Sequence, residues 1–368
     1  MSTLNVNTIN AATSGQAVAV DVQNPRSFRN LIINGAMQVA QRGNSTSVGT
    51  SGYYGPDRFK YAEVSDAVFS ISKSTESPDG FSSSYHMDCT TADTSVAATD
   101  YARILTVLEG QDVQAFAKGT SSAKKGVLSF YVKTNKTGTY SLFYFDSDNN
   151  RQFNATYTVS DSNWNRYTIE IPADTTGALT NDNNASIEIY WHLVAGSNRT
   201  TGSLDATWNT YTGTKEAAGH NVNFADSTSN DFYITGVQLE VGDVATDFEH
   251  RSFGDELARC QRYWQQSYET GTSAGTSTNT NAVIWYPDTT YGYANVTFSL
   301  PCVMRTQPTV TTYSSTGASG KIRNTDGNAD VNAYIDTNSN NCIMMAANNV
   351  SINQGYRIRA HYTASAEL

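Results

Sequence analysis

Short apolar runs separated by turn residues are the feature of this sequence that most limits its fold. In each run, apolar residues alternate with polar ones or aromatic residues are concentrated, and Gly, Asn, Asp or Ser clusters bound it, as is typical of antiparallel β-strands. The runs are 67–73, 126–134, 139–146, 153–160, 165–172, 186–194 and 231–241. They predict an all-β fold, with one jelly-roll-like antiparallel β-sandwich over residues 29–250.

The amino-acid composition agrees with a sandwich that has polar loops. The chain has 22 Tyr, 14 Phe and 7 Pro residues, and 16% of its residues are charged. Ser, Thr, Asn and Gly fill the spaces between the apolar runs, as expected for this class. A surface covered by hydroxyl and amide groups is more typical of an extracellular or virion protein than of a cytosolic enzyme.

The net charge of -10 limits the partners that the protein can have. No cluster of Lys and Arg is present to neutralise phosphates, so neither nucleic acid nor an anionic membrane is expected as the main partner. The sequence shows no apolar stretch long enough to span a membrane and no secretory leader. We therefore expect synthesis in a cytoplasm without a signal peptide, and no membrane span.

The sequence contains no recognisable motif for a metal, a cofactor or catalysis. Asp146 to Arg151 begins like a calcium loop, but Arg151 replaces the turn glycine and no Glu follows at the twelfth position, so a hairpin turn is expected. The five histidines lie in no nucleophile motif. The cysteines are too far apart for a zinc site and predict free thiols in packed positions: Cys89, Cys260, Cys302 and Cys342. We expect no cofactor, no metal site and no enzymatic activity.

Three further segments flank the predicted sandwich. Residues 1–28 are polar and small, which predicts an extended arm that needs a partner to become ordered. Residues 251–269 predict a connecting helix, with Ser252 or Asp255 as its N-cap. A stretch rich in Gly, Ser and Thr and further strand-like runs then predict a smaller C-terminal β-domain over residues 270–368.

Four residues at helical spacing give the connecting helix one apolar stripe: Leu257, Cys260, Trp264 and Tyr268. Two interpretations of this stripe are open. If three chains run side by side, the stripes can pack about a common axis and form the interface of a homotrimer. Alternatively, the stripe packs back onto the sandwich of its own chain.

Several stretches between Asn30 and Trp264 resemble the carbohydrate-binding-module-like sandwich of bacteriophage tail fibres and other virion proteins. They include "NLIINGAMQVAQRG", "YYGPDRF", "WNRYTIEIP", "ATWNTYTG" and "ITGVQLEVGDVATDFEHRSFGDELARCQRYW". The chain departs from this pattern at Ala40 and Phe59, where the family often has Trp. These departures concern core aromatics, so they leave the fold expectation unchanged and weaken any transfer of ligand contacts.

The resemblance implies a virion protein on the exterior of the phage tail. Proteins of this kind commonly attach to the particle by their N-terminus, which implies that residues 1–28 dock to a tail or baseplate protein. Their C-terminal regions commonly carry the tip functions, which implies contact of residues 270–368 with a host surface glycan. A tail fibre is therefore expected. The alternatives are a capsid or baseplate decoration fibre that binds no receptor, and a glycan-degrading depolymerase.

Exposed aromatic rings beside amides and carboxylates are the groups that bind sugars. Two aromatic clusters are candidates, and core packing is the alternative for each of their members: Trp208 and Tyr211 in the first, Trp285, Tyr286, Tyr291 and Tyr293 in the second. Four acidic residues in the family-like stretches are interpreted as structural instead of catalytic: Asp57, Glu109, Glu240 and Glu249.

Overall fold

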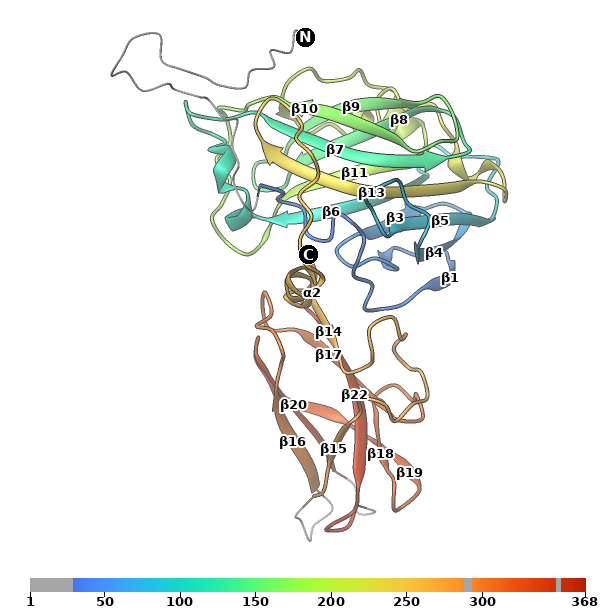
Figure 1. Ribbon diagram of the computed structural model, residues 1–368, viewed down its shortest axis with the longest axis vertical. Helices are drawn as coiled ribbons and strands as arrows, with labels where there is room; N and C mark the ends of the chain where they lie inside the picture. Colours follow the sequence, from blue (N-terminus) through green and yellow to red (C-terminus); the bar gives the residue numbers. More distant parts are fainter. Residues whose placement is uncertain (1–28, 288–292, 349–351) are drawn as a thin grey trace, which may run out of the picture.

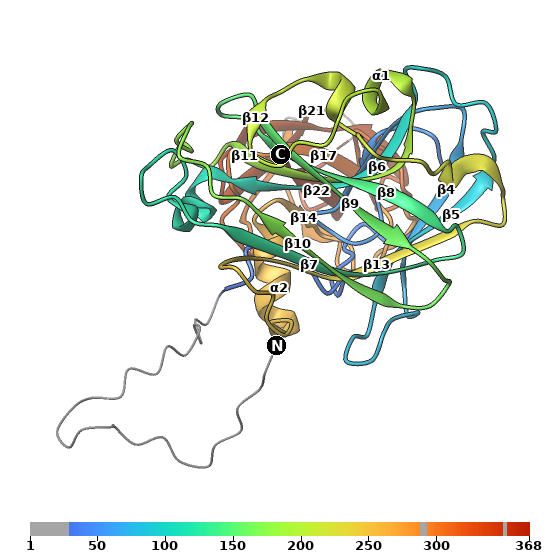
Figure 2. The ribbon, with the colours of Figure 1, turned by 90° about the horizontal axis from the view of Figure 1, so that it is seen from above.

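The computed structural model describes residues 29–287, 293–348 and 352–368. The proposed arm, residues 1–28, lies outside the described residues. Figure 1 shows a β-sandwich above a smaller β-domain, with helix α2 (Phe253–Gln261) between them. In the view from above, α2 projects at one edge of the sandwich (Figure 2). The all-β class is as the sequence predicts.

Two antiparallel sheets form the sandwich. The six-stranded sheet has the order β1 (Ser45–Val48), β4 (Val68–Ser74), β5 (Ser84–Thr91), β13 (Asp231–Val241), β7 (Gly126–Thr134) and β10 (Asn165–Ile171). The seven-stranded sheet has the order β12 (Asn209–Thr210), β9 (Arg151–Val159), β8 (Gly138–Asp146), β11 (Ala185–Ala195), β6 (Tyr101–Glu109), β3 (Lys60–Val64) and β2 (Gly52–Tyr53). Consecutive strands in the chain repeatedly change sheets, as in a jelly roll.

Side chains from the inner faces of both sheets form one core. Trp191 from β11 is fully buried, and its ring meets that of Phe130 from β7 edge-on at a centroid distance of 5.7 Å. Tyr144 and Phe69 are also buried in this core. Burial of each such side chain stabilises the fold by about 1.5–3 kcal/mol, because apolar surface leaves water.

Each strand run quoted from the sequence is a strand in the structure, and β7 and β13 have the predicted bounds. The segment after β6 forms two short 3-10 turns, η1 (Gly110–Asp112) and η2 (Gln114–Phe116). Strands β5 and β6 were not predicted. Strand β6 lies between β11 and β3 and buries residues on both of its faces, so its sequence does not alternate cleanly.

The connecting helix is shorter than the sequence predicts. Ser252 is its N-cap, as expected, and its side chain accepts a hydrogen bond from the backbone N–H of Asp255. The helix ends at Gln261, because the carbonyl of Arg262 accepts from the backbone N–H of Arg305 and the next residues pair with a distant strand. Those residues form β14 (Trp264–Gln266), which pairs with β22 (Ile358–Ser365). The C-terminal sheet therefore begins at Trp264, earlier than predicted.

The prediction of one helical stripe is wrong as a consequence. Trp264 and Tyr268 lie beyond the helix, and Trp264 packs under the guanidinium of Arg42, 4.0 Å from its ring centroid. Tyr268 is buried and stacks on His361 at 4.0 Å. Cys260 is fully buried and Leu257 is half-buried. Trp264 and Tyr268 thus contact other parts of their own chain, and the homotrimer interface stays a prediction.

The C-terminal domain is built around β22. One sheet contains β14, β15 (Val283–Trp285), β17 (Thr309–Ser314), β18 (Lys321–Asn324), β19 (Ala329–Asn332) and β22, and the other contains β16 (Tyr293–Ser299), β20 (Tyr334–Asn338) and β21 (Cys342–Asn348). Strand β22 pairs with β14, β15, β17 and β18. Residues such as Ile343, Met345 and Ile358 fill a separate core in this domain.

Buried ion pairs join the two domains. Arg58, with a side chain only 2% exposed, pairs with Glu367, and its guanidinium carbon lies 3.5 Å from the ring centroid of Tyr263. Glu109 accepts two hydrogen bonds from Arg262, at 2.8 and 2.7 Å. The "DRF" and "QRYW" stretches of the resemblance therefore meet at this interface.

Two further expectations are confirmed in the described residues, the free thiols and the hairpin turn from Asp146 to Arg151. The four cysteines are free thiols. In the described ranges, no helix is long and apolar enough to cross a membrane, and no group of His, Cys, Asp and Glu residues is arranged to hold a metal ion. The stretch from Asp146 to Arg151 is a hairpin turn between β8 and β9, and Asp146 binds the ammonium of Lys118 at 2.5 Å.

Candidate functional site

Two cavities lie on the outer face of the seven-stranded sheet. Strand β6 alternates there, because Ala102, Ile104 and Leu108 point into the main core while the residues between them point outward. Leu105 and Val107 belong to an apolar cluster on this outer face, with Tyr101 packed against it. The floor of the site therefore follows from the two-residue period of one strand.

The strand register places outward residues in rows across the sheet. Leu105 on β6 lies between Lys60 on β3 and Tyr190 on β11. Arg103 lies between Ala62 and His192 in the neighbouring row. Directly opposed residues on one face of a sheet have Cβ atoms about 4.5–5.5 Å apart. Residues distant in sequence thus form one continuous surface.

The segment between β11 and β13 forms a wall beside this floor. It contains α1 (Ser197–Thr200) and η3 (Gly213–Lys215), and backbone hydrogen bonds tie the two together, from Gly202 to Thr214 at 2.8 Å and from Ala217 to Arg199 at 2.9 Å. This bracing fixes Arg199 above the sheet. Its guanidinium carbon lies 4.1 Å from the ring centroid of Tyr101.

Two adjoining cavities lie on this floor, and Tyr101 lines both. We call them together the sheet groove. One measures about 400 Å³ and is lined by residues that include Lys60, Arg103, Glu188 and Tyr190. The other measures about 340 Å³, and its lining includes Asn198, Arg199, Tyr211 and Glu216. Cavities of about 300–1,000 Å³ are the usual size of small-ligand sites.

Hydrogen bonds fix the charged groups of the sheet groove. Glu216 accepts hydrogen bonds from Arg103 and, at 3.1 Å, from the Tyr211 hydroxyl. Glu188 accepts from the Tyr190 hydroxyl at 2.6 Å. Burial, together with the nearby Glu216, raises the pKa of Tyr211, so its hydroxyl keeps its proton. The arrangement offers guanidinium, amide and hydroxyl donors and carboxylate acceptors, which are the groups that bind sugar hydroxyls.

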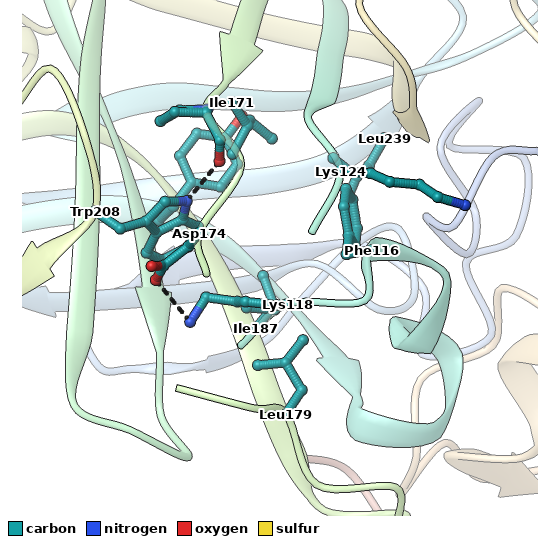
Figure 3. Close-up of a pocket in the computed structure, with 11 residues that line it drawn as sticks. Phe116, Lys118, Lys124, Ile171, Asp174, Leu179, Ile187, Trp208 and Leu239 are labelled. Atoms are coloured by element: carbon teal, nitrogen blue, oxygen red, sulfur yellow. Dashed lines mark hydrogen bonds and ion pairs between the residues drawn. The ribbon is translucent and has the colours of Figure 1, made fainter. Parts of the chain in front are cut away.

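Trp208, a predicted glycan contact, lies elsewhere and is buried. It is 9% exposed, and its indole N–H donates to the carbonyl of Pro172 at 2.9 Å. Figure 3 shows it beside Lys118 and Asp174 in a third cavity of about 30 Å³. One water needs about 10–15 Å³ measured in this way, so the cavity is too small for a sugar. The prediction for Trp208 is wrong, because its ring closes one end of the sandwich.

Tyr211 is the predicted contact that the structure places in the sheet groove. It is half-buried and packs edge-on against Phe143 and Phe145, with ring centroids at 6.2 and 5.3 Å. Trp208 and Tyr211 are close in sequence, but the structure assigns them to different sites. Trp208 and Tyr211 therefore do not form one cluster, although they are close in the sequence.

Two members of the second predicted cluster, in the C-terminal domain, lie in the described part of the chain with their side chains. Trp285 is only 8% exposed and belongs to the core of that domain, so it is not available to a ligand. Tyr286 is 62% exposed. Tyr291 lies outside the described residues, as does the side chain of Tyr293, whose backbone begins β16.

Most residues of the sheet groove were missed in the sequence. They include Lys60, Tyr101, Arg103, Glu188, Tyr190 and Arg199. A usable indication was present in "SIEIYWHLV", where Glu188, Tyr190 and His192 stand at every second position of a largely apolar strand. In "YARILTVLE" only Tyr101 and Arg103 follow each other at this spacing. Arg199, in contrast, lies in the short helix α1, and no sequence pattern places it above Tyr101.

Comparisons with known proteins show low similarity. No protein-family model matches the chain, and no curated protein matches it. Among solved structures, a tailspike protein of bacteriophage CBA120 aligns at 11% identity and a TM-score of 0.32, over 58% of this chain and 22% of the tailspike. A family 11 carbohydrate-binding module of Clostridium thermocellum aligns at 12% identity and a TM-score of 0.29, over 57% of this chain and 98% of the module.

A third similar structure is a tandem pair of family 22 carbohydrate-binding modules from Paenibacillus barcinonensis. It aligns at 9% identity and a TM-score of 0.27, over 92% of this chain and 98% of the pair. At these values the alignments establish neither family membership nor a shared ligand. The functional argument below therefore rests on the residues of the sheet groove.

Proposed function

We propose that this chain is a non-enzymatic carbohydrate-binding protein of a bacteriophage virion, a tail fibre that binds a host surface glycan in the sheet groove. The observation that carries this proposal is the pair of adjoining cavities on a braced sheet face, lined by Tyr, Arg, Glu and Asn side chains. The resemblance of the sequence to virion proteins supports the biological setting. A groove on strands holds its polar groups rigidly, which limits the entropy lost on binding.

The sheet groove replaces the C-terminal aromatic cluster as the principal site. Trp285 is buried in the core of the C-terminal domain, so its ring is not available to a ligand. Tyr286 remains a second candidate because its ring is available to solvent. The two sites lie in different domains, so separate variants distinguish them.

The test compares binding of the full chain and its variants to an array of bacterial surface polysaccharides. We expect Glu188→Gln and Tyr101→Ala each to weaken binding by about tenfold or more, because the first replaces a carboxylate acceptor with an amide and the second removes the ring that lines both cavities. Tyr286→Ala is expected to bind like the unmodified protein. Loss of binding in the Tyr286 variant alone would move the site to the C-terminal domain.

The absence of enzymatic activity belongs to the same proposal. Glu188 and Glu216 both line the sheet groove, and each already accepts a hydrogen bond from a neighbouring side chain. We propose that these carboxylates hold the groove in shape and accept hydrogen bonds from sugar hydroxyls, without acting as acid or base. Incubation with the polysaccharide that binds best is expected to release no reducing sugar. Release that disappears in Glu188→Gln would favour the depolymerase alternative.

Assembly and docking are further parts of the proposal. We propose a homotrimer in which α2 contributes to the contact, since Phe253 is 49% exposed and Leu257 is half-buried on this helix. Residues 1–28 are proposed to dock to a tail or baseplate protein. Sedimentation should give a trimeric mass, and Phe253→Asp with Leu257→Asp should lower it. A monomeric mass for the unmodified chain would contradict the trimer.

A further inference from the structure

The tyrosine rings of the sheet groove are covered by cations. The guanidinium carbon of Arg103 lies 4.6 Å from the ring centroid of Tyr101 and 4.1 Å from that of Tyr190. Arg199 lies over Tyr101 as well, at 4.1 Å. A neutral sugar usually stacks its apolar face on an uncovered aromatic ring. In this groove the guanidinium groups occupy positions that such a sugar would need.

Positive charge is in excess where the two cavities meet. Arg103 and Arg199 share one carboxylate, because Glu216 accepts from Nη1 of Arg103 and lies 3.5 Å from Nε of Arg199. Beneath them, burial lowers the pKa of His192 well below its usual value, and Arg103 lowers it further, so His192 is neutral. Two cations against one carboxylate leave one positive charge in a protein whose net charge is -10.

Donor groups remain at this junction. Arg103 uses Nη1 for Glu216, and Arg199 uses Nη1 for the carbonyl of Thr99 at 2.8 Å. Within the described ranges, the Nη2 group of neither arginine meets an acceptor. The two side chains are 14% and 21% exposed, which leaves them accessible from the cavities. A guanidinium matches a carboxylate particularly well, since its planar N–H groups can donate in pairs.

From this arrangement we infer that the sheet groove selects an acidic glycan, one whose sugar rings bear a carboxylate as uronic acids do. The carboxylate lies against Arg103 and Arg199 at the junction above Tyr101. Hydroxyl groups of the same or neighbouring sugars are bound by Glu188 in one cavity and Asn198 in the other. The inference rests on the proposed glycan-binding function and adds the class of glycan.

The experiment uses the full chain and the polysaccharide array, with polymers that contain uronic acid and polymers that are neutral. The acidic polymer that binds best is then reduced chemically, so that each carboxylate becomes a hydroxymethyl group. We expect binding only to acidic polymers, and a loss of about tenfold or more on carboxyl reduction. Arg199→Gln should lower the affinity for the acidic polymer by a similar factor. Arg199→Lys should lower this affinity less, because it keeps the charge.

Arg166→Gln is the matched control, since Arg166 is an exposed arginine near the Tyr131 ring, at 5.9 Å, on the six-stranded sheet. It should bind like the unmodified protein, and melting curves confirm that each variant is folded. If the carboxyl-reduced polymer bound as tightly as the acidic polymer, the inference of an acidic glycan would be overturned. The glycan-binding proposal would still stand. Failure to bind any polymer on the array would overturn both.

Discussion

Arg58 shows how much a single buried charge contributes to this protein. Its guanidinium pairs with Glu367, donates to the carbonyl of Val107 at 2.7 Å and covers the ring of Tyr263. Arg58→Met would leave Glu367 buried beside fewer cations. We expect a loss of about 3–5 kcal/mol in the free energy of unfolding, measured by urea denaturation, because an unpaired buried charge is costly.

The exposed pair of Lys125 and Glu170 provides the control for this measurement. Their side chains are 46% and 53% exposed, so solvent screens the pair and Lys125→Met should leave the urea midpoint unchanged. Arg58→Met combined with Glu367→Gln should recover part of the stability. An Arg58 variant as stable as the Lys125 variant would show that the buried pair does not hold the domains together.

Single residues differ in how well the sequence predicts their role. Asp57, Glu109 and Glu249 were interpreted as structural, and each accepts a hydrogen bond within the fold: Asp57 from Gln41, Glu109 from Arg262, and Glu249 from the backbone N–H of Asn30. Trp208 and Trp285 were wrong as glycan contacts. Side-chain type indicates a capacity to bind sugar, but the direction in which a ring points depends on packing that a short stretch does not contain.

At the scale of elements, the end of β6 is tied to the segment that follows α2 through Glu109. Although burial opposes it, hydrogen bonds from Arg262 and Tyr263 lower the pKa of Glu109 below its usual value of 4.5. A carboxylate with a lowered pKa in the folded state stabilises the protein above its unfolded pKa, and this contribution is lost as the pH falls through the folded pKa. The contacts of Glu109 with Arg262 and Tyr263 should therefore stabilise the protein less in acid, below about pH 4.5.

Glu109→Gln tests this tie. We expect the variant to have a lower melting temperature than the unmodified protein at pH 7, and a smaller difference between the two as the pH falls below about 4.5. Glu170→Gln, at an exposed carboxylate, is the matched control and should follow the unmodified protein at every pH. If the difference in melting temperature between the Glu109 variant and the unmodified protein stayed constant from neutral to acid pH, the role of ionised Glu109 would be contradicted.

Strands were predicted better than the helix for a physical reason. The alternation in β7 is enforced locally, since Leu128, Phe130 and Val132 on one face of the strand meet the core. The spacing of Leu257, Cys260, Trp264 and Tyr268 also fits a helix, but Trp264 to Gln266 pair instead with β22, about a hundred residues further along the chain. Such long-range pairing overrides a local period, and the sequence around the helix does not reveal it.

At the scale of the whole molecule, the sheet groove combines residues that are far apart in the sequence. Lys60, Arg103 and Tyr190 come from three strands, and Arg199 comes from the wall segment. The net charge of -10 gives no indication of the local positive charge there. The fold class was therefore predictable from the strand pattern, whereas the site depends on strand order and register, which the pattern does not specify.

Hydrogen–deuterium exchange of the full chain, with and without the acidic polysaccharide that binds best, tests the central claim most directly. Strand amides are already protected, so the informative regions are the wall segment from α1 to η3 and the residues around Tyr286. If the sheet groove binds the glycan, exchange in the wall segment slows on addition of the polysaccharide, and exchange around Tyr286 does not change. Slower exchange around Tyr286 with an unchanged wall segment would contradict the assignment of the site.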